Sequence, residues 1–150
     1  MTWVPHLTVA TIVERDGRFL LVEETIAGRR VYNQPAGHLE DGETILEAAV
    51  RETLEETGWT VEPVALVGVY QWRHPGNGET FVRFCFTARP LRHHPDRPLD
   101  AGIQRAVWLS RSALADLAGQ LRSPLVLRCI DDYLSGNRHP LDVVRHIASP

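Results

Sequence analysis

The stretch "GHLEDGETILEAAVRETLEETGW", residues 37–59, decides the fold. Thr44 and Glu47 have the spacing of a capping box, in which each side chain hydrogen-bonds the other residue's backbone at the start of a helix. Gly58 is the residue type that most often follows the last helical turn. The stretch therefore predicts a helix that begins at Thr44 and ends before Gly58. One face of this helix is formed by Ile45, Ala48, Ala49 and Thr53.

The same helix carries more negative charge than its own stability favours. Residues 43–56 hold five glutamates and one arginine. Glu52, Glu55 and Glu56 fall in the last turn, where carboxylates repel one another and meet the negative end of the helix dipole. One interpretation is a solvated face on which Arg51 pairs with its neighbours. The alternative, which explains the whole cluster, is a bound divalent cation, because Mg²⁺ and Mn²⁺ prefer carboxylate oxygens.

These residues resemble a known signature. The pattern G-x5-E-x7-R-E-U-x-E-E-x-G-U, with U an aliphatic residue, is the Nudix box, and all its fixed positions match: Gly37, Glu43, Arg51, Glu52, Glu55, Glu56 and Gly58. Thr53 and Trp59 stand where the pattern has aliphatic residues, which concerns the packing of the helix. The resemblance implies an α/β fold, a Nudix-type α/β/α sandwich with a mixed central β-sheet. We expect one such domain over residues 1–150.

The resemblance also implies roles for these residues. Glu52, Glu55 and Glu56 would ligate Mg²⁺, with Mn²⁺ as an alternative ion and the Gly37 carbonyl as a further ligand. One of the three glutamates would serve as, or orient, the base for the attacking water. Arg51 would hold a glutamate in place, with Glu43 as its ion-pair partner, and Gly58 would support the site by ending the helix.

Many family members add an acidic residue from a later loop, shortly before a strand that carries a Trp. In "PLDAGIQRAVW" the place just before the isoleucine holds Gly102. Asp100 is therefore the nearest candidate for the extra acid, and Asp96 and Glu79 are weaker candidates.

The similarity extends to phosphatases of this family over about residues 6–141, through segments such as "YNQPAGHLEDGET" and "SGNRHPL". It implies a hydrolase of acid anhydrides in phosphorus-containing compounds. The substrates would be nucleoside di- and triphosphates, thiamine pyrophosphate and hydroxymethylpyrimidine pyrophosphate, with release of orthophosphate. The alternatives are another Nudix specificity, for ADP-ribose, dinucleoside polyphosphates or RNA 5′ ends, and a non-catalytic ligand sensor on the same fold.

Candidate substrate contacts are of two kinds. Tyr32, Tyr70 and Trp72 could stack on a planar ring, although each could equally pack in the core. Arg30 and Arg83 could bind phosphate, and the charge of Arg83 inside the apolar run "FVRFCF" is the most suggestive. Two amides beside the predicted site could hydrogen-bond the substrate: Asn33 and Gln34.

Elsewhere the chain alternates strands and helices. Residues 7–13 and 18–24 are β-rich and are joined by an Asp-Gly turn, which predicts a hairpin. Residues 27–37 are expected to be irregular, residues 63–73 and 80–90 to form a second hairpin, and residues 105–110 a strand. Two later helices are expected, the first capped by Ser110 and the second spanning 124–136. Trp3 and Trp108 are expected in the core.

The composition and net charge of the chain limit the kinds of binding partner that we expect. A net charge of −3 argues against a nucleic-acid duplex and leaves a small pyrophosphate or nucleotide substrate. Cys85 and Cys129 are expected to be free core residues, as in a reducing compartment. The chain shows no apolar run of about 20 residues and no secretion signal, so we expect a cytoplasmic protein without a membrane span. We expect a monomer, with a dimer left open.

Overall fold

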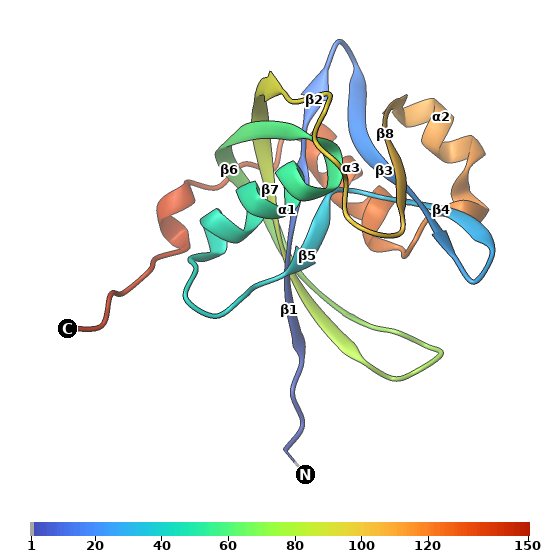
Figure 1. Ribbon diagram of the computed structural model, residues 1–150. Helices are drawn as coiled ribbons and strands as arrows, with labels where there is room; N and C mark the ends of the chain where they lie inside the picture. The colour runs from blue at the N-terminus through green and yellow to red at the C-terminus, as the bar shows by residue number, and fades with distance from the viewer. Residues whose placement is uncertain (1) are drawn as a thin grey trace.

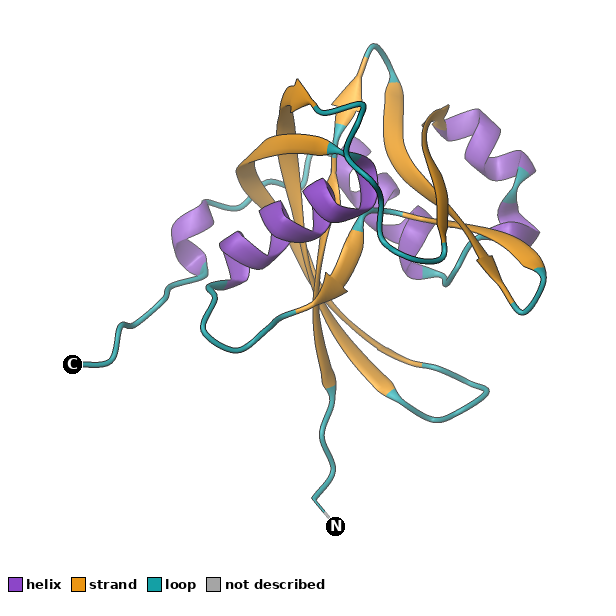
Figure 2. Ribbon diagram, in the orientation of Figure 1, coloured by secondary structure: helices purple, strands orange, loops and turns teal. Residues whose placement is uncertain are grey.

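The computed structural model describes residues 2–150, which form two β-sheets with helices packed on them (Figures 1 and 2). The first sheet has the strand order β5-β1-β7-β6. Its β1 and β7 are parallel, whereas β5 and β6 are antiparallel to their neighbours, so the sheet is mixed as predicted. Its strands are β1 (His6–Ile12), β5 (Ala36–His38), β6 (Trp59–Arg73) and β7 (Thr80–His93).

Helices cover both faces of this mixed sheet. Successive strand residues point to opposite faces, and in β1 Val9 packs with Ala48 and Ala49 of α1 (Ile45–Thr57). The next residue, Ala10, belongs to the cluster that contains Cys129 of α3 (Leu125–Leu134). In Figure 1, α1 crosses in front of the sheet and α3 lies behind it. The predicted α/β/α sandwich is confirmed.

The second sheet was not predicted. It contains β2 (Glu14–Arg15), β3 (Arg18–Ile26) and β4 (Arg29–Asn33) in that order, and β8 (Ile103–Ser110) also pairs with β3. The predicted hairpin of residues 7–13 with 18–24 is wrong, because the chain leaves the first sheet after β1. The short β2 pairs with β3 instead, and from the predicted run Val13 accepts one hydrogen bond from the Leu20 N–H. The expectation that residues 27–37 are irregular is also wrong, since β4 and β5 lie there.

The remaining elements agree with the sequence more closely. The hairpin of β6 and β7 is confirmed, with register shifts that curve it. Ser110 caps α2 (Arg111–Asp116) by accepting a hydrogen bond from the Ala113 N–H. Helix α3 begins one residue later than predicted. Two 3₁₀ turns complete the chain, η1 (Ala118–Gln120) and η2 (Leu141–Val143).

The two departures from the Nudix box have visible packing solutions. Thr53 is fully buried, and its hydroxyl lies 2.8 Å from the Thr11 hydroxyl on β1 and 2.8 Å from the Ala49 carbonyl oxygen. Trp59 stacks on His93 with ring centroids 4.7 Å apart and meets Trp108 edge-on. A polar pair and an aromatic cluster thus replace the usual aliphatic contacts.

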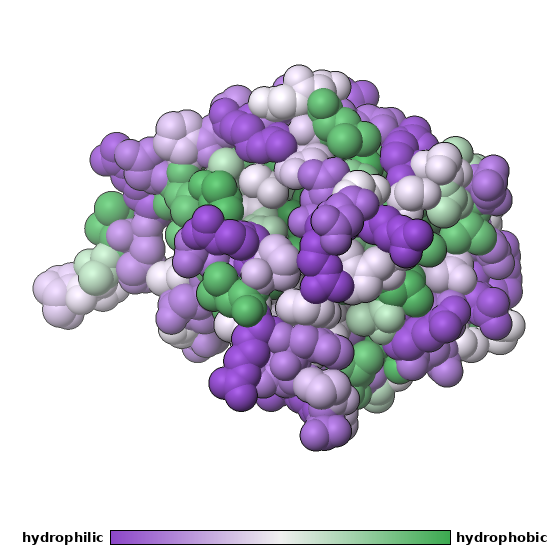
Figure 3. All heavy atoms as spheres, turned by 90° about the horizontal axis from the view of Figure 1, so that it is seen from above, coloured by the Kyte–Doolittle hydropathy of each residue, from purple (hydrophilic) through white to green (hydrophobic). Residues whose placement is uncertain are grey.

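The surface is mixed in character. On the face seen from above, hydrophobic residues are scattered among hydrophilic ones (Figure 3). Trp3 is 67% exposed, so its predicted core position is wrong, whereas Trp108 packs against a buried cluster. Cys85 and Cys129 are buried and free, as expected. Among residues 2–150, no helix is long and apolar enough to cross a membrane.

Candidate active site on helix α1

Helix α1 has the ends that its sequence predicts. The Thr44 hydroxyl accepts from the Glu47 N–H at 3.1 Å, and the Glu47 carboxylate accepts from the Thr44 N–H at 2.9 Å. Gly58 takes the left-handed conformation, with φ at 76°, and donates its N–H to the Leu54 carbonyl oxygen. The last turn contains no basic residue. The caps therefore fix both ends of the helix. No basic side chain in the last turn offsets the negative charge of the glutamates there.

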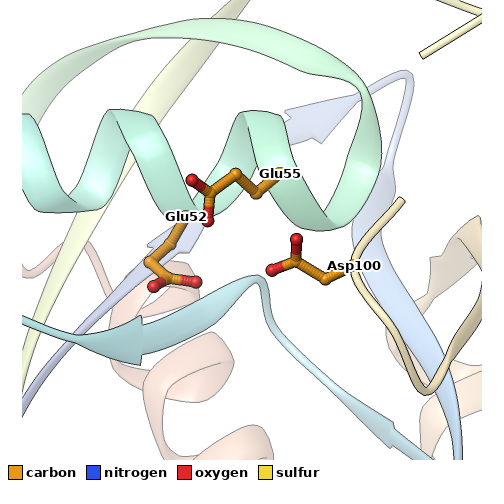
Figure 4. Close-up of side chains that lie close together, drawn as sticks. All are labelled: Glu52, Glu55 and Asp100. Carbon is orange, nitrogen blue, oxygen red and sulfur yellow. The ribbon is translucent and has the colours of Figure 1, made fainter. Parts of the chain in front are cut away.

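Three carboxylates converge at this end of the helix. One oxygen each from Glu52, Glu55 and Asp100 lie within 4.8 Å of one another. Figure 4 shows that two come from α1 and the third from the loop before β8. This loop is tied to the helix, because the Asp100 N–H donates to the Glu55 carbonyl oxygen at 3.1 Å. The structure thus brings Asp100, the sequence candidate for the extra acid, to the glutamates.

Arg51 joins the acids to the preceding loop. Its Nε and Nη2 donate to the two oxygens of Glu43 at 2.9 and 2.7 Å, which confirms the predicted ion pair. Its Nη1 lies 2.7 Å from Glu52 Oε1 and 3.2 Å from Glu55 Oε2. Hydrogen bonds from Arg51 hold the pKa of Glu43 below its usual value. One guanidinium therefore orients Glu52 and Glu55 but cannot neutralise the whole cluster.

Glu56 is not one of the three acids in this group and is more deeply buried. Its Oε1 accepts the Ala36 N–H at 2.8 Å. Burial raises the pKa of Glu56 to about 8, the Ala36 hydrogen bond opposes that rise, and the charge of Glu52 adds to it. Burial likewise raises the pKa of Glu52, against the effect of Arg51. Both groups bind protons more tightly than ordinary glutamates as long as no cation is near.

Position 37 has room only for glycine, because the carboxylate of Glu52 lies next to its backbone. A Cβ atom at this position would lie 2.1 Å from Glu52 Cδ. Gly37 is in β5 and pairs with Val9 of β1, so the backbone there is fixed by the sheet. Any side chain at position 37 would have to displace Glu52.

A cavity of about 580 Å³ adjoins this group. Its walls include Gly37, Glu52 and Glu56 from the Nudix box, and the predicted substrate contacts Trp72 and Arg83. Gln34 lies behind the wall, fully buried, and is hydrogen-bonded to Arg83 at 2.9 Å. The cavity is of the size that holds a small molecule.

A second hollow of about 550 Å³ lies beside the first. The two share Trp72, His74, Arg122 and Ser123. The rest of the second hollow is mainly apolar, lined by Pro75, Ala118, Leu121, Pro124 and Leu127. Trp72 thus stands between an acidic compartment and an apolar one.

Three other predicted contacts lie elsewhere. Tyr32 is buried and donates its hydroxyl to Glu23 at 2.9 Å. Arg30 is exposed beside the same glutamate. Neither Tyr32 nor Arg30 lines either of the two hollows. Tyr70 packs on the same side as Trp72, but its hydroxyl donates to Asp132 of α3 at 2.8 Å.

Part of the cavity wall was missed from the sequence. Arg122 Nη1 donates to Glu24 Oε2 at 2.6 Å, and both residues line the cavity. They are 98 positions apart in the chain, and neither lies in the Nudix box. The contact depends on tertiary packing: the Arg122 N–H donates to the Tyr32 carbonyl oxygen on β4 at 2.8 Å, and β4 pairs with β3, which carries Glu24.

The acidic group suits a divalent cation. Its donors are carboxylate oxygens alone, which hard cations prefer, and three negative charges so close together need more positive charge than Arg51 supplies. Glu52 lies within α1, and Asp100 lies in a loop that a backbone hydrogen bond ties to the same helix. The residues present therefore fit a bound metal ion.

Comparison with known proteins agrees with this geometry. The NUDIX domain family model matches residues 4–128. Phosphatase NudJ of Escherichia coli K12 is 44% identical over 140 residues, covering 93% of this chain and 90% of that protein. A NUDIX hydrolase from Nitrosomonas europaea has 46% identity and a TM-score of 0.94, covering 96% of this chain and 98% of that one. A UDP-X diphosphatase, at 19% identity and a TM-score of 0.74, covering 93% of this chain and 67% of that one, shares the fold.

The family model, the relatives and the complete acidic motif on a capped helix agree. This chain belongs to the Nudix hydrolases, enzymes that act on pyrophosphate bonds.

Proposed function

We propose that the protein hydrolyses phosphoanhydride bonds in small di- and triphosphates and releases orthophosphate, with Mg²⁺ as cofactor and Mn²⁺ as an alternative ion. The observation that carries this proposal is the convergence of Glu52, Glu55 and Asp100 beside a cavity large enough for a small molecule. The relatives named phosphatase support orthophosphate as the product. The proposed substrates are nucleoside di- and triphosphates, thiamine pyrophosphate and hydroxymethylpyrimidine pyrophosphate.

The cation would neutralise phosphate charge and make a nearby water more acidic. Glu52, Glu55, Asp100 and Glu56 would hold it, with the Gly37 carbonyl as a further ligand. Arg51 keeps Glu52 and Glu55 in place through its hydrogen bonds. One of the three glutamates takes the proton of the attacking water or orients the group that does. No side chain needs to form a covalent bond with the substrate, since positioning and charge stabilisation account for this chemistry.

The two adjoining hollows favour a substrate with a ring at one end. The phosphates would lie beside the acidic group, whose carboxylates would hold the cation. The mainly apolar hollow on the other side of Trp72 suits the flat, apolar faces of a heterocycle. Nucleotides and thiamine pyrophosphate both have this two-part character.

Two other functions remain as competitors. Another Nudix specificity, for ADP-ribose, dinucleoside polyphosphates or RNA 5′ ends, would use the same acidic group with different walls. A non-catalytic sensor would not need the glutamates of α1, yet all of them are present. The sensor is therefore the weaker alternative.

Product analysis by mass spectrometry tests the proposal. The purified protein is incubated with Mg²⁺ and, separately, with thiamine pyrophosphate, hydroxymethylpyrimidine pyrophosphate, GTP, GDP or ADP-ribose, with EDTA as control. We expect orthophosphate from the first four compounds and none from ADP-ribose. Cleavage of ADP-ribose alone would contradict the proposed substrates and favour another Nudix specificity. No cleavage of any compound would favour the non-catalytic sensor.

A further inference from the structure

Arg83 is a buried cation without a carboxylate partner. It lies on β7, is 5% exposed, and forms no ion pair within residues 2–150. Two neutral amide oxygens accept its hydrogen bonds, Gln34 Oε1 at 2.9 Å from Nη1 and Asn33 Oδ1 at 3.3 Å from Nη2, and the Cys129 sulfur lies 4.0 Å from Nη1. Its Nε–H has no partner in the described chain. Buried charges are normally paired, because an isolated one is costly.

The neighbours of Arg83 hold it in place without neutralising it. Gln34 is 1% exposed and donates its Nε2 to the Val126 carbonyl oxygen on α3 at 2.6 Å. That bond turns the amide oxygen of Gln34 toward Arg83. In the flipped orientation the amide NH₂ of Gln34 would face the N–H groups of Arg83, and neither could accept a hydrogen bond. Asn33 fixes a second corner of the guanidinium. Nη2 carries two N–H groups and is recorded with one acceptor, so donor capacity remains.

The location of Arg83 in the cavity wall suggests why a buried cation stands at this position. Arg83 and Asn33 line the same cavity as Gly37, Glu52 and Glu56. Strand alternation places Arg83 and Cys85 on the α3 side of the sheet, whereas Phe84 and Phe86 pack toward α1. The cavity therefore combines an acidic group, suited to a metal ion, with one unneutralised guanidinium.

We propose that Arg83, braced by Gln34 and Asn33, binds the phosphate group of the substrate, so that the substrate supplies the missing negative charge. This inference rests on the proposed function, because it assumes a phosphate-bearing ligand in this cavity. A planar guanidinium offers paired donors that match phosphate oxygens, and such charged hydrogen bonds are among the strongest in proteins. Arg83 would thus set the class of substrate as a phosphate ester or anhydride.

A binding measurement without metal tests this role separately from catalysis. The thermal midpoint of unfolding is compared in EDTA with sodium phosphate and with sodium chloride at equal ionic strength. We expect phosphate to raise the midpoint of the wild type by roughly 3 °C or more at saturation. Arg83→Met should lose that rise. Arg89→Met is the matched control, since Arg89 lies on the same strand, is exposed and pairs with Glu62, and this variant should keep the rise.

Kinetics provide the second arm. With Mg²⁺ and GDP, Arg83→Lys should raise KM by roughly 10- to 100-fold, because lysine keeps the charge and loses the planar fork. This variant also serves if Arg83→Met does not fold. An unchanged phosphate response in Arg83→Met, no response in the wild type, or an unchanged KM in Arg83→Lys would overturn the proposal. If no diphosphate is hydrolysed but the phosphate response depends on Arg83, the proposed function fails and the phosphate site stands.

Discussion

Gly37 and Glu52 are in such close contact that a Cβ atom on Gly37 would lie 2.1 Å from the carboxyl carbon of Glu52. Real Cβ contacts essentially never come that close, so the glycine of the Nudix box has a steric reason in this chain. The same approach places the Gly37 backbone beside the acidic group. Gly37 of β5 and Glu52 of α1 thus form adjoining parts of the cavity wall.

Gly37→Ala should therefore displace Glu52 and reduce kcat/KM. A shift of about 1 Å in a catalytic group costs roughly 100-fold, which is the loss that we expect for orthophosphate release from GDP. Gly119→Ala is the control, because no heavy atom lies within 4 Å of a Cβ atom placed there. Equal activity of the two variants would show that Glu52 can move without consequence.

Asp100→Asn should weaken the response to metal. Asp100 shares the acidic group with Glu52 and Glu55, so this change would remove one charged carboxylate from the proposed ligands of the cation. We expect the Mg²⁺ concentration for half-maximal rate to rise roughly tenfold or more. Asp96→Asn, in the same loop and outside the group, should leave it unchanged. A larger effect of Asp96→Asn than of Asp100→Asn would indicate that Asp96, and not Asp100, is the extra acid of the site.

The stability of the metal-free protein should fall as pH rises. The pKa of Glu56 is raised from 4.5 to about 8 by burial, so the folded state binds a proton that the unfolded state has released between these values. Its stabilising effect is complete below pH 4.5 and is lost as pH rises through 8, a change on the order of 5 kcal/mol. Glu52 shifts in the same direction.

Urea unfolding in EDTA between pH 5 and 8 measures this slope. Glu56→Gln should flatten it, because an amide does not titrate. Mg²⁺ at pH 8 should stabilise the wild type more than the variant if the ionised Glu56 carboxylate is one of its ligands, as proposed. Equal slopes for the two proteins would place the titrating group elsewhere.

The buried hydroxyl pair of Thr11 and Thr53 predicts non-additive effects on stability. The two oxygens are 2.8 Å apart, and Thr11 has no other recorded side-chain partner in residues 2–150. Thr53→Val should cost about 1–3 kcal/mol of unfolding free energy, because it strands the Thr11 hydroxyl. The double variant Thr11→Val, Thr53→Val should recover much of this loss. Additive losses in a double-mutant cycle would show that the pair is not coupled.

The sequence predicts local features of this protein well. The ends of α1 depend on Thr44, Glu47 and Gly58, which act within one turn of the helix. The ion pair of Arg51 with Glu43 follows from the same motif, and both residues lie on short, connected segments. Such features are determined by neighbours in sequence, so a pattern is enough to predict them.

Contacts between distant segments were harder to predict. The β-rich runs 7–13 and 18–24 look like a hairpin, but β1 instead pairs with β7, more than 70 residues later. The Asp-Gly turn was identified correctly and belongs to the much shorter β2–β3 hairpin. Arg122 reaches Glu24 and Arg83 reaches Gln34 only because the sheets bring them together. Tertiary packing, which no local signal encodes, determines the non-acidic walls of the cavity.

The most direct test of the account is the rate of orthophosphate release from GDP as a function of Mg²⁺ concentration, for the wild type and for Glu55→Gln. Glu55 is partly exposed on a capped helix, so the isosteric amide should leave the fold intact, which circular dichroism verifies. We predict no turnover of the wild type in EDTA, saturable activation by Mg²⁺, and no activation of Glu55→Gln. Turnover in EDTA, or wild-type activation of Glu55→Gln, would contradict a cation held by the carboxylates of α1.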